Sequence, residues 1–147
     1  MTRPFADPSV KAVFEGFPID VREMALILRE LIFDVAAETP AAGRVQEALR
    51  WHQPSYLTPE TKSGSTLRIG ASKHGGCALF AHCATDIIST YAATFQGCER
   101  IEGNRAVIFR NASEIVPDRL RLMIYHGLTY HLDEERKRPF SAAPPKL

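Results

Sequence analysis

The side chains best suited to bind a ligand lie at residues 51–56, a Trp-His-Gln-Pro-Ser-Tyr run that holds the only tryptophan of the chain, and at two positions further along the sequence. Tryptophan and tyrosine combine an apolar ring with a hydrogen-bonding group, glutamine adds an amide, and arginine can hold a carboxylate or a phosphate. We therefore predict a non-enzymatic binding site for a small polar or aromatic molecule. Its expected residues are Trp51, Gln53, Tyr56, Arg68 and His82.

Each member of this set also has a structural explanation, which the sequence leaves open. Trp51 and Tyr56 are large aromatic residues of the kind that usually pack in or beside a core. His82 is expected on the core side of a strand, where a histidine is more often a hydrogen-bonded structural residue than a ligand. Arg68 and Lys62 flank a Ser-Gly-Ser run, which is typical of a solvated loop as well as of an anion site.

Charge and composition disfavour several classes of partner. The 147 residues carry a formal net charge of +1, so no long-range basic field favours nucleic acid or an anionic membrane. The apolar runs are far shorter than the roughly 20 residues that span a bilayer, and the N-terminus has no apolar core of a signal peptide. We therefore expect a cytoplasmic protein with neither nucleic acid nor membrane as a partner, and a homodimer is left open.

No common cofactor motif or catalytic motif is present. The sequence holds no GxxxxGK[ST] or GxGxxG phosphate-binding pattern, no HExxH zinc pattern and no GxSxG nucleophile turn. The five histidines are not spaced as metal pairs. We therefore expect no cofactor, and an enzyme with an unrecognised site is the second alternative to small-molecule binding.

The three cysteines are expected to stay reduced. Cys77 and Cys83 lie six residues apart in a predicted strand, which separates them by about 20 Å. A disulfide needs α-carbons within about 7 Å, so this pair cannot form in a straight strand. Together with Cys98, they are interpreted as small buried apolar residues.

Helical periodicity is strongest between Val21 and Val35, where apolar residues recur every three or four positions. Asp20, three residues before Glu23, is expected to cap this helix. Gly127 lies inside the last predicted helix, where glycine costs about 1 kcal/mol relative to alanine, so we expect close packing against the sheet there. Other helices are predicted at residues 8–14, 45–49, 86–97 and 117–128.

Residues 65–72 and 77–83 alternate as the two strands of a hairpin. A turn of two or four residues between them would place Leu67 on the same side as Phe80 and His82. This side is expected to face the helices.

A second hairpin is predicted around Gly103-Asn104. This dipeptide favours a two-residue turn, because such a turn needs positive φ angles. The turn would set Glu102 opposite Arg105, within reach of an ion pair.

The order of the predicted elements is helices, then strands around one short helix, then a helix. This order indicates a single α+β domain, with an antiparallel sheet of about five strands covered by the N- and C-terminal helices. The domain is expected to span residues 1–132. Residues 133–147 show no apolar periodicity and are expected to form a flexible polar tail.

Three short motifs resemble those of the YdhG-like family of bacterial domains, many of which are labelled as being of unknown function. They are Trp51-x-x-Pro54-x-Tyr56, Phe80-Ala81-His82-Cys83 and Glu102-Gly103-Asn104-Arg105-Ala106. The resemblance covers residues 14–131 and implies the same α+β fold. It assigns no role to the residues of these motifs.

The resemblance also implies the first alternative function, because at least one YdhG-like protein is regarded as a frataxin-like iron chaperone, and frataxins use an acidic surface on an early helix. Four carboxylates lie on one face of the long predicted helix here: Glu23, Glu30, Asp34 and Glu38. Oxygen ligands suit transient iron binding. Arg22 and Arg29 lie beside this stripe and Ile27 interrupts it, which is typical of an ordinary solvated helix face.

Overall fold

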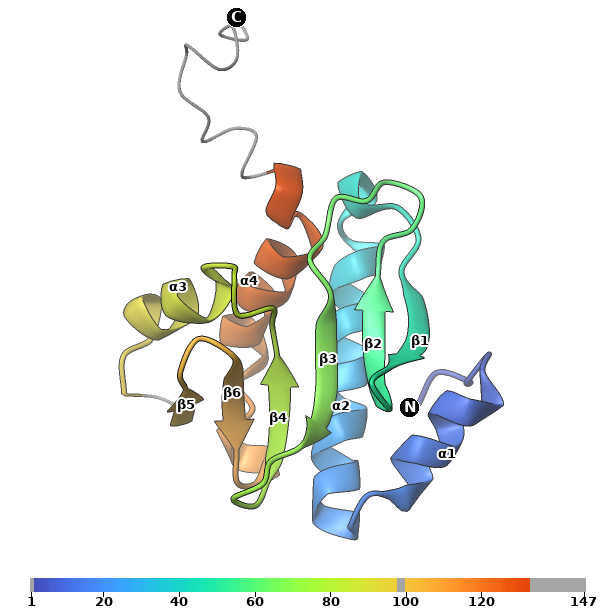
Figure 1. The fold of residues 1–147 in the computed structure, drawn as a ribbon, viewed down its shortest axis with the longest axis vertical. Coiled ribbons are helices and arrows are strands. Elements are labelled where there is room, and N and C mark those ends of the chain that lie inside the picture. Colours follow the sequence, from blue (N-terminus) through green and yellow to red (C-terminus); the bar gives the residue numbers. More distant parts are fainter. Residues whose placement is uncertain (1, 98–99, 133–147) are drawn as a thin grey trace, which may run out of the picture.

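A six-stranded antiparallel sheet forms the framework of the molecule (Figure 1). The computed structural model describes residues 2–97 and 100–132, and the strand order is β1-β2-β3-β4-β6-β5. The strands are β1 (Gln46–Arg50), β2 (Gln53–Leu57), β3 (Leu67–Ala71), β4 (Cys77–Phe80), β5 (Arg100–Glu102) and β6 (Ala106–Phe109). The helices are α1 (Pro8–Gly16), α2 (Ile19–Ala37), α3 (Ile87–Thr94) and α4 (Pro117–Leu128), with short 3-10 helices at Pro40–Ala42 and Ala112–Glu114. The predicted α+β domain with an antiparallel sheet is confirmed, with six strands in place of five, and the predicted tail lies outside the described residues.

Helices α2 and α4 pack on one face of the sheet (Figure 1). The α2 residues Met24, Leu28 and Ile32, spaced four positions apart, are at most 1% exposed and face the core. The apolar stripe predicted for α4 is buried in the same way. Pro18 occupies the cap position of α2 and Asp20 lies in its first turn, so the predicted cap role of Asp20 is wrong. None of the helices in the described ranges is long and apolar enough to cross a membrane.

Residues 45–49 were expected to be helical, but they belong almost entirely to strand β1. Every residue of β1 pairs with one in β2, from Gln46 with Leu57 to Arg50 with Gln53. A segment of five residues is too short for its apolar spacing to distinguish a helix from a strand. Pairing with β2 therefore decides the structure of this segment and supplies the sixth strand.

The turn between β3 and β4 has five residues, because Ala71 pairs with Cys77. Strand side chains alternate, so an odd turn length reverses the facing that an even turn would produce. Leu67 lies in the core beneath the helices, whereas Arg68 and Phe80 pair on the opposite face. The prediction that Leu67 and Phe80 share a side is therefore wrong.

The turn between β5 and β6 has three residues, because Glu102 pairs with Ala106. The predicted two-residue turn, with Glu102 opposite Arg105, is therefore wrong by one position. The backbone N–H of Arg105 donates to the Glu102 carbonyl at 3.0 Å and closes the turn. Gly103 has a φ of +51°, so the positive φ that motivated the turn prediction is present.

Replacing Gly103 by valine is expected to lower the free energy of unfolding by about 1–2 kcal/mol, because valine would be held in the left-handed region. A β-carbon at this position would have no neighbour within 4 Å, so backbone strain is the sole cost. Urea unfolding measures the loss. The control is Gly103→Asn. Asparagine tolerates positive φ, so this variant should lose less stability. Equal stability of the two variants would contradict the assignment.

Gly127 lies where α4 meets the sheet, as predicted. A β-carbon at this position would lie 3.0 Å from side-chain carbons of Leu67, which is fully buried. The close approach of helix and strand explains why glycine occupies the interior of this helix.

Cys77 and Cys83 are free thiols, as predicted. Cys77 is buried in the core, and burial raises the pKa of its thiol to about 12. Cys83 follows the end of β4 and is exposed, so it does not share the buried environment that was expected for it. Cys98 lies outside the described residues.

Candidate ligand-binding site

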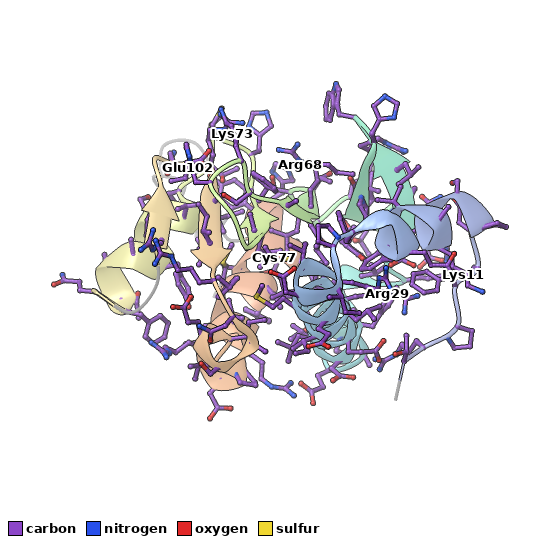
Figure 2. All side chains as sticks on the ribbon, turned by 90° about the horizontal axis from the view of Figure 1, so that it is seen from below. Lys11, Arg29, Arg68, Lys73, Cys77 and Glu102 are labelled. Carbon is purple, nitrogen blue, oxygen red and sulfur yellow. The ribbon has the colours of Figure 1, made fainter. Side chains whose placement is uncertain are left out.

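One face of the sheet carries no helix, and we call it the open face (Figures 1 and 2). In Figure 2, Arg68, Lys73 and Glu102 point to this side, whereas Cys77 and Arg29 lie on the side of the helices. Strand register assigns these further residues to the open face: Arg50, Gln53, Gly70, Ala78, Phe80, Arg100, Ala106 and Ile108. Its apolar members form a small cluster that is separate from the main core.

Trp51 lies at the tip of the β1–β2 hairpin and is 81% exposed. It shares a two-residue turn with His52, and their φ angles are +50° and +63°. Left-handed conformations cost roughly 1–2 kcal/mol for residues other than glycine, so two bulky side chains here are unfavourable for the fold. The explanation of Trp51 as a core residue is therefore excluded.

The guanidinium group of Arg68 lies between two aromatic rings. Its central carbon is 5.7 Å from the ring centroid of Trp51 and 5.5 Å from that of Phe80. Nη1 of Arg68 donates to Oε1 of Gln53 at 2.9 Å, which fixes the orientation of the group. Burial, and then the charge of Arg105, lower the pKa of Arg68. Among the described residues no carboxylate pairs with this guanidinium, so its charge and several of its N–H donors are left for a ligand.

Gly70 makes this arrangement possible. A β-carbon at position 70 would lie 2.7 Å from Nε2 of Gln53 and 3.2 Å from the ring of Phe80. Because glycine leaves this space empty, the two side chains can lie against the strand and support Arg68 from below.

A groove of about 330 Å³ opens beside Arg68. It is lined by Arg50, Trp51, Gly64, Ser65, Thr66, Arg68, His82 and His131. The lining combines the indole of Trp51 with two guanidinium, two imidazole and two hydroxyl groups. A groove that combines apolar surface with a few convergent polar groups is typical of a small-molecule site.

The structure brings three of the five predicted residues to the groove, namely Trp51, Arg68 and His82, and Gln53 supports Arg68 beside it. His82 is exposed, so the expectation that it faces the core is wrong. Its Nδ1 accepts the N–H of Ala84 at 3.0 Å, which leaves Nε2 as the hydrogen-bond donor of the neutral ring.

Tyr56 lies on the helix side of the sheet and takes no part in the groove. It is 1% exposed, and its hydroxyl donates to Oε2 of Glu47 at 2.7 Å. Burial, followed by the charge of Glu47, raises the pKa of Tyr56 well above its usual value. Tyr56 and Gln53 do not share a surface, because residues three positions apart on a strand face opposite sides.

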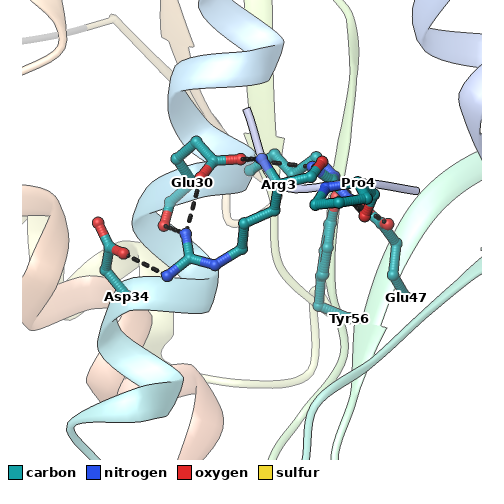
Figure 3. Close-up of polar contacts among 7 residues, drawn as sticks. Arg3, Pro4, Glu30, Asp34, Glu47 and Tyr56 are labelled. Atoms are coloured by element: carbon teal, nitrogen blue, oxygen red, sulfur yellow. Dashed lines mark hydrogen bonds and ion pairs between the residues drawn. The ribbon is translucent and has the colours of Figure 1, made fainter. Parts of the chain in front are cut away.

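Arg29 is the buried polar residue whose importance the sequence did not reveal. It is 1% exposed, and it donates to both carboxylate oxygens of Glu47 at 2.6 and 3.0 Å. It also donates to the carbonyls of Arg3 and Pro4, and its guanidinium lies 3.8 Å from the ring centroid of Phe5. The N-terminal segment, part of which is drawn in Figure 3, is thereby joined to α2 and β1. In the sequence, Arg29 is distinguished only by its place beside the acidic stripe.

Three of the four carboxylates of the acidic stripe pair with arginines. Its four members are Glu23, Glu30, Asp34 and Glu38. Glu30 and Asp34 each lie 2.7 Å from the guanidinium of Arg3 (Figure 3), and Glu38 lies 2.9 Å from that of Arg121. Within residues 2–97 and 100–132, no group of three or more His, Cys, Asp or Glu side chains could hold a metal ion. Iron binding stays a prediction from the resemblance.

Comparisons of this chain with family models, curated proteins and solved structures found no match. Membership of the YdhG-like family therefore stays a prediction from the three motifs.

Proposed function

We propose that this protein is a non-enzymatic binding domain for a small anionic molecule that contains a flat ring, and that the ligand occupies the groove beside Trp51 and Arg68. The observation that carries the proposal is the set of contacts made by the guanidinium group of Arg68. Its guanidinium is oriented by Gln53 and flanked by two rings, yet among the described residues it has no carboxylate partner.

A carboxylate or phosphate is the natural partner for such a group. Guanidinium donors bind these anions through charge-assisted, often bidentate hydrogen bonds. Partial burial and the neighbouring Arg105 make the positive charge of Arg68 less stable, as the direction of its pKa shift indicates. An incoming anion would offset both effects.

The flat ring of the ligand is expected to stack on Trp51. The indole is exposed at the tip of a tight turn, where few rotatable bonds separate it from the rigid hairpin. A pre-positioned ring loses little conformational entropy on binding. Stacking also explains why a tryptophan is kept in a backbone conformation that favours glycine or asparagine.

We also infer a cytoplasmic location. Cys77 and Cys83 are free thiols. The cytosol keeps thiols reduced, so this state of the two side chains supports that compartment.

Titration with thymidine monophosphate is expected to quench the fluorescence of Trp51. Thymidine supplies the ring alone and inorganic phosphate the anion alone, so each should bind more weakly than the monophosphate. Arg68→Gln is expected to lower the affinity for thymidine monophosphate by about 10- to 100-fold, which corresponds to the loss of a hydrogen bond to a charged group.

The matched control is Arg121→Gln, which removes one positive charge from the side of the helices. It should bind thymidine monophosphate as the unmodified protein does, and both variants should melt within a few degrees of it. Absence of quenching by all three compounds, or equal binding by the two variants, would refute the proposal.

A further inference from the structure

The open face is much more basic than the chain as a whole. It carries Arg50, Arg68, Lys73, Arg100, Arg105 and Arg110. Glu102 is the one carboxylate that strand register places among them within the described residues. None of these arginines forms an ion pair with a described carboxylate. The net charge of +1 therefore averages over a basic open face and an acidic α2.

Arginines lie at both edges of the sheet. Arg50 pairs with Gln53 at one edge, and Ile108 pairs with Arg100 at the other. Between them lie Gly70 and Ala78, which are paired with each other. Their small side chains project little from the sheet. Neighbouring strands are about 4.8 Å apart, so this row of six strands spans roughly 24 Å. The middle of the row is small and apolar, and each end has an arginine.

A second hollow, of about 410 Å³, lies at the far end of this row. It is lined by His74, Gly75, Arg100, Ile101, Glu102, Ile108 and Arg110, so two guanidinium groups and one carboxylate lie beside apolar side chains. It therefore resembles the groove beside Trp51 in placing two guanidinium groups next to apolar surface. A small anion in one hollow would leave the other empty.

We propose that the open face binds single-stranded nucleic acid, with bases stacked on Trp51 and phosphates along the arginines. The inference rests on the proposed function for its contact at Trp51 and Arg68, and it extends the ligand across β4, β6 and β5. A positive surface combined with an exposed aromatic ring is the arrangement by which proteins hold single strands with little sequence preference. Arginine also contributes, because its planar group can both bind phosphate and stack.

Octathymidylate is expected to bind at least about tenfold more tightly than thymidine monophosphate, because it reaches both hollows. Fluorescence anisotropy of the labelled strand measures the affinity. The logarithm of the binding constant should fall with the logarithm of salt concentration, by roughly 0.7 for each phosphate contact.

The double variant Arg100→Gln/Arg110→Gln should lower the affinity for octathymidylate by about tenfold. It should also reduce the slope of log binding constant against log salt concentration by about 1.4. It should leave thymidine monophosphate binding unchanged, since both residues lie outside the groove at Trp51. Lys11→Gln/Arg121→Gln removes the same charge from α1 and α4, and it should leave both ligands unaffected.

The outcomes separate the two proposals. If thymidine monophosphate binds and octathymidylate binds no more tightly, the nucleic-acid inference is overturned and the proposed function stands. If neither binds, both are overturned. Equal affinity for poly-glutamate of the same charge would identify an acidic protein as the partner and overturn the inference, as would equal losses in the two double variants.

Discussion

Arg29→Leu is expected to lower the free energy of unfolding by about 3–5 kcal/mol, because it removes one partner of a buried ion pair. The side chain of Glu47 is 7% exposed and would lose both hydrogen bonds from the guanidinium. The carbonyls of Arg3 and Pro4 would lose their donors as well, which should release the N-terminal segment from α2. Urea unfolding measures the loss.

Two variants test the cause of this loss. Arg29→Leu/Glu47→Leu removes both charges and should be more stable than Arg29→Leu, because no carboxylate is left buried alone. Arg121→Leu breaks the exposed pair with Glu38 and should cost less than about 1 kcal/mol. A loss below that value for Arg29→Leu would show that water replaces the guanidinium without penalty, contrary to this interpretation.

Trp51→Asn/His52→Gly is expected to raise the free energy of unfolding by about 1–2 kcal/mol while removing ligand binding, because Asn-Gly is the preferred sequence for a two-residue turn with positive φ angles. Trp51 is 81% exposed, so little buried contact is lost. Urea unfolding followed by circular dichroism measures stability, and calorimetry with thymidine monophosphate measures binding. Opposite effects on the two quantities are typical of residues kept for function.

The control for this variant is Trp51→Phe, which keeps an aromatic ring in the same backbone conformation. It should leave stability nearly unchanged and retain part of the affinity, since phenylalanine can stack but has no indole N–H. If Trp51→Asn/His52→Gly were less stable than the unmodified protein, Trp51 would have a packing role and the argument from strain would fail.

The sequence by itself determined the elements whose pattern is local and long. Periodicity over α2 and α4 repeats enough times to define which face is buried, and residues 24, 28 and 32 are core residues as that pattern requires. The α+β class follows from the order of such elements. Gly127 was identified for the same reason, because a glycine inside a clear helix demands an explanation.

Only the tertiary structure decided how the strands face. The β3–β4 turn has five residues, and this odd number places Arg68 and Phe80 on the same open face. Short sequences do not specify the length of a turn to one residue. The residue types of the binding site were recognisable, but their grouping was not: Trp51 and Arg68 meet, whereas Tyr56 lies beneath the sheet. The sequence also did not reveal the basic open face. The net charge is a sum over the chain, and it contains no information about the face on which each arginine lies. Composition and spacing are local properties, and a surface is assembled from strands that are far apart in the sequence.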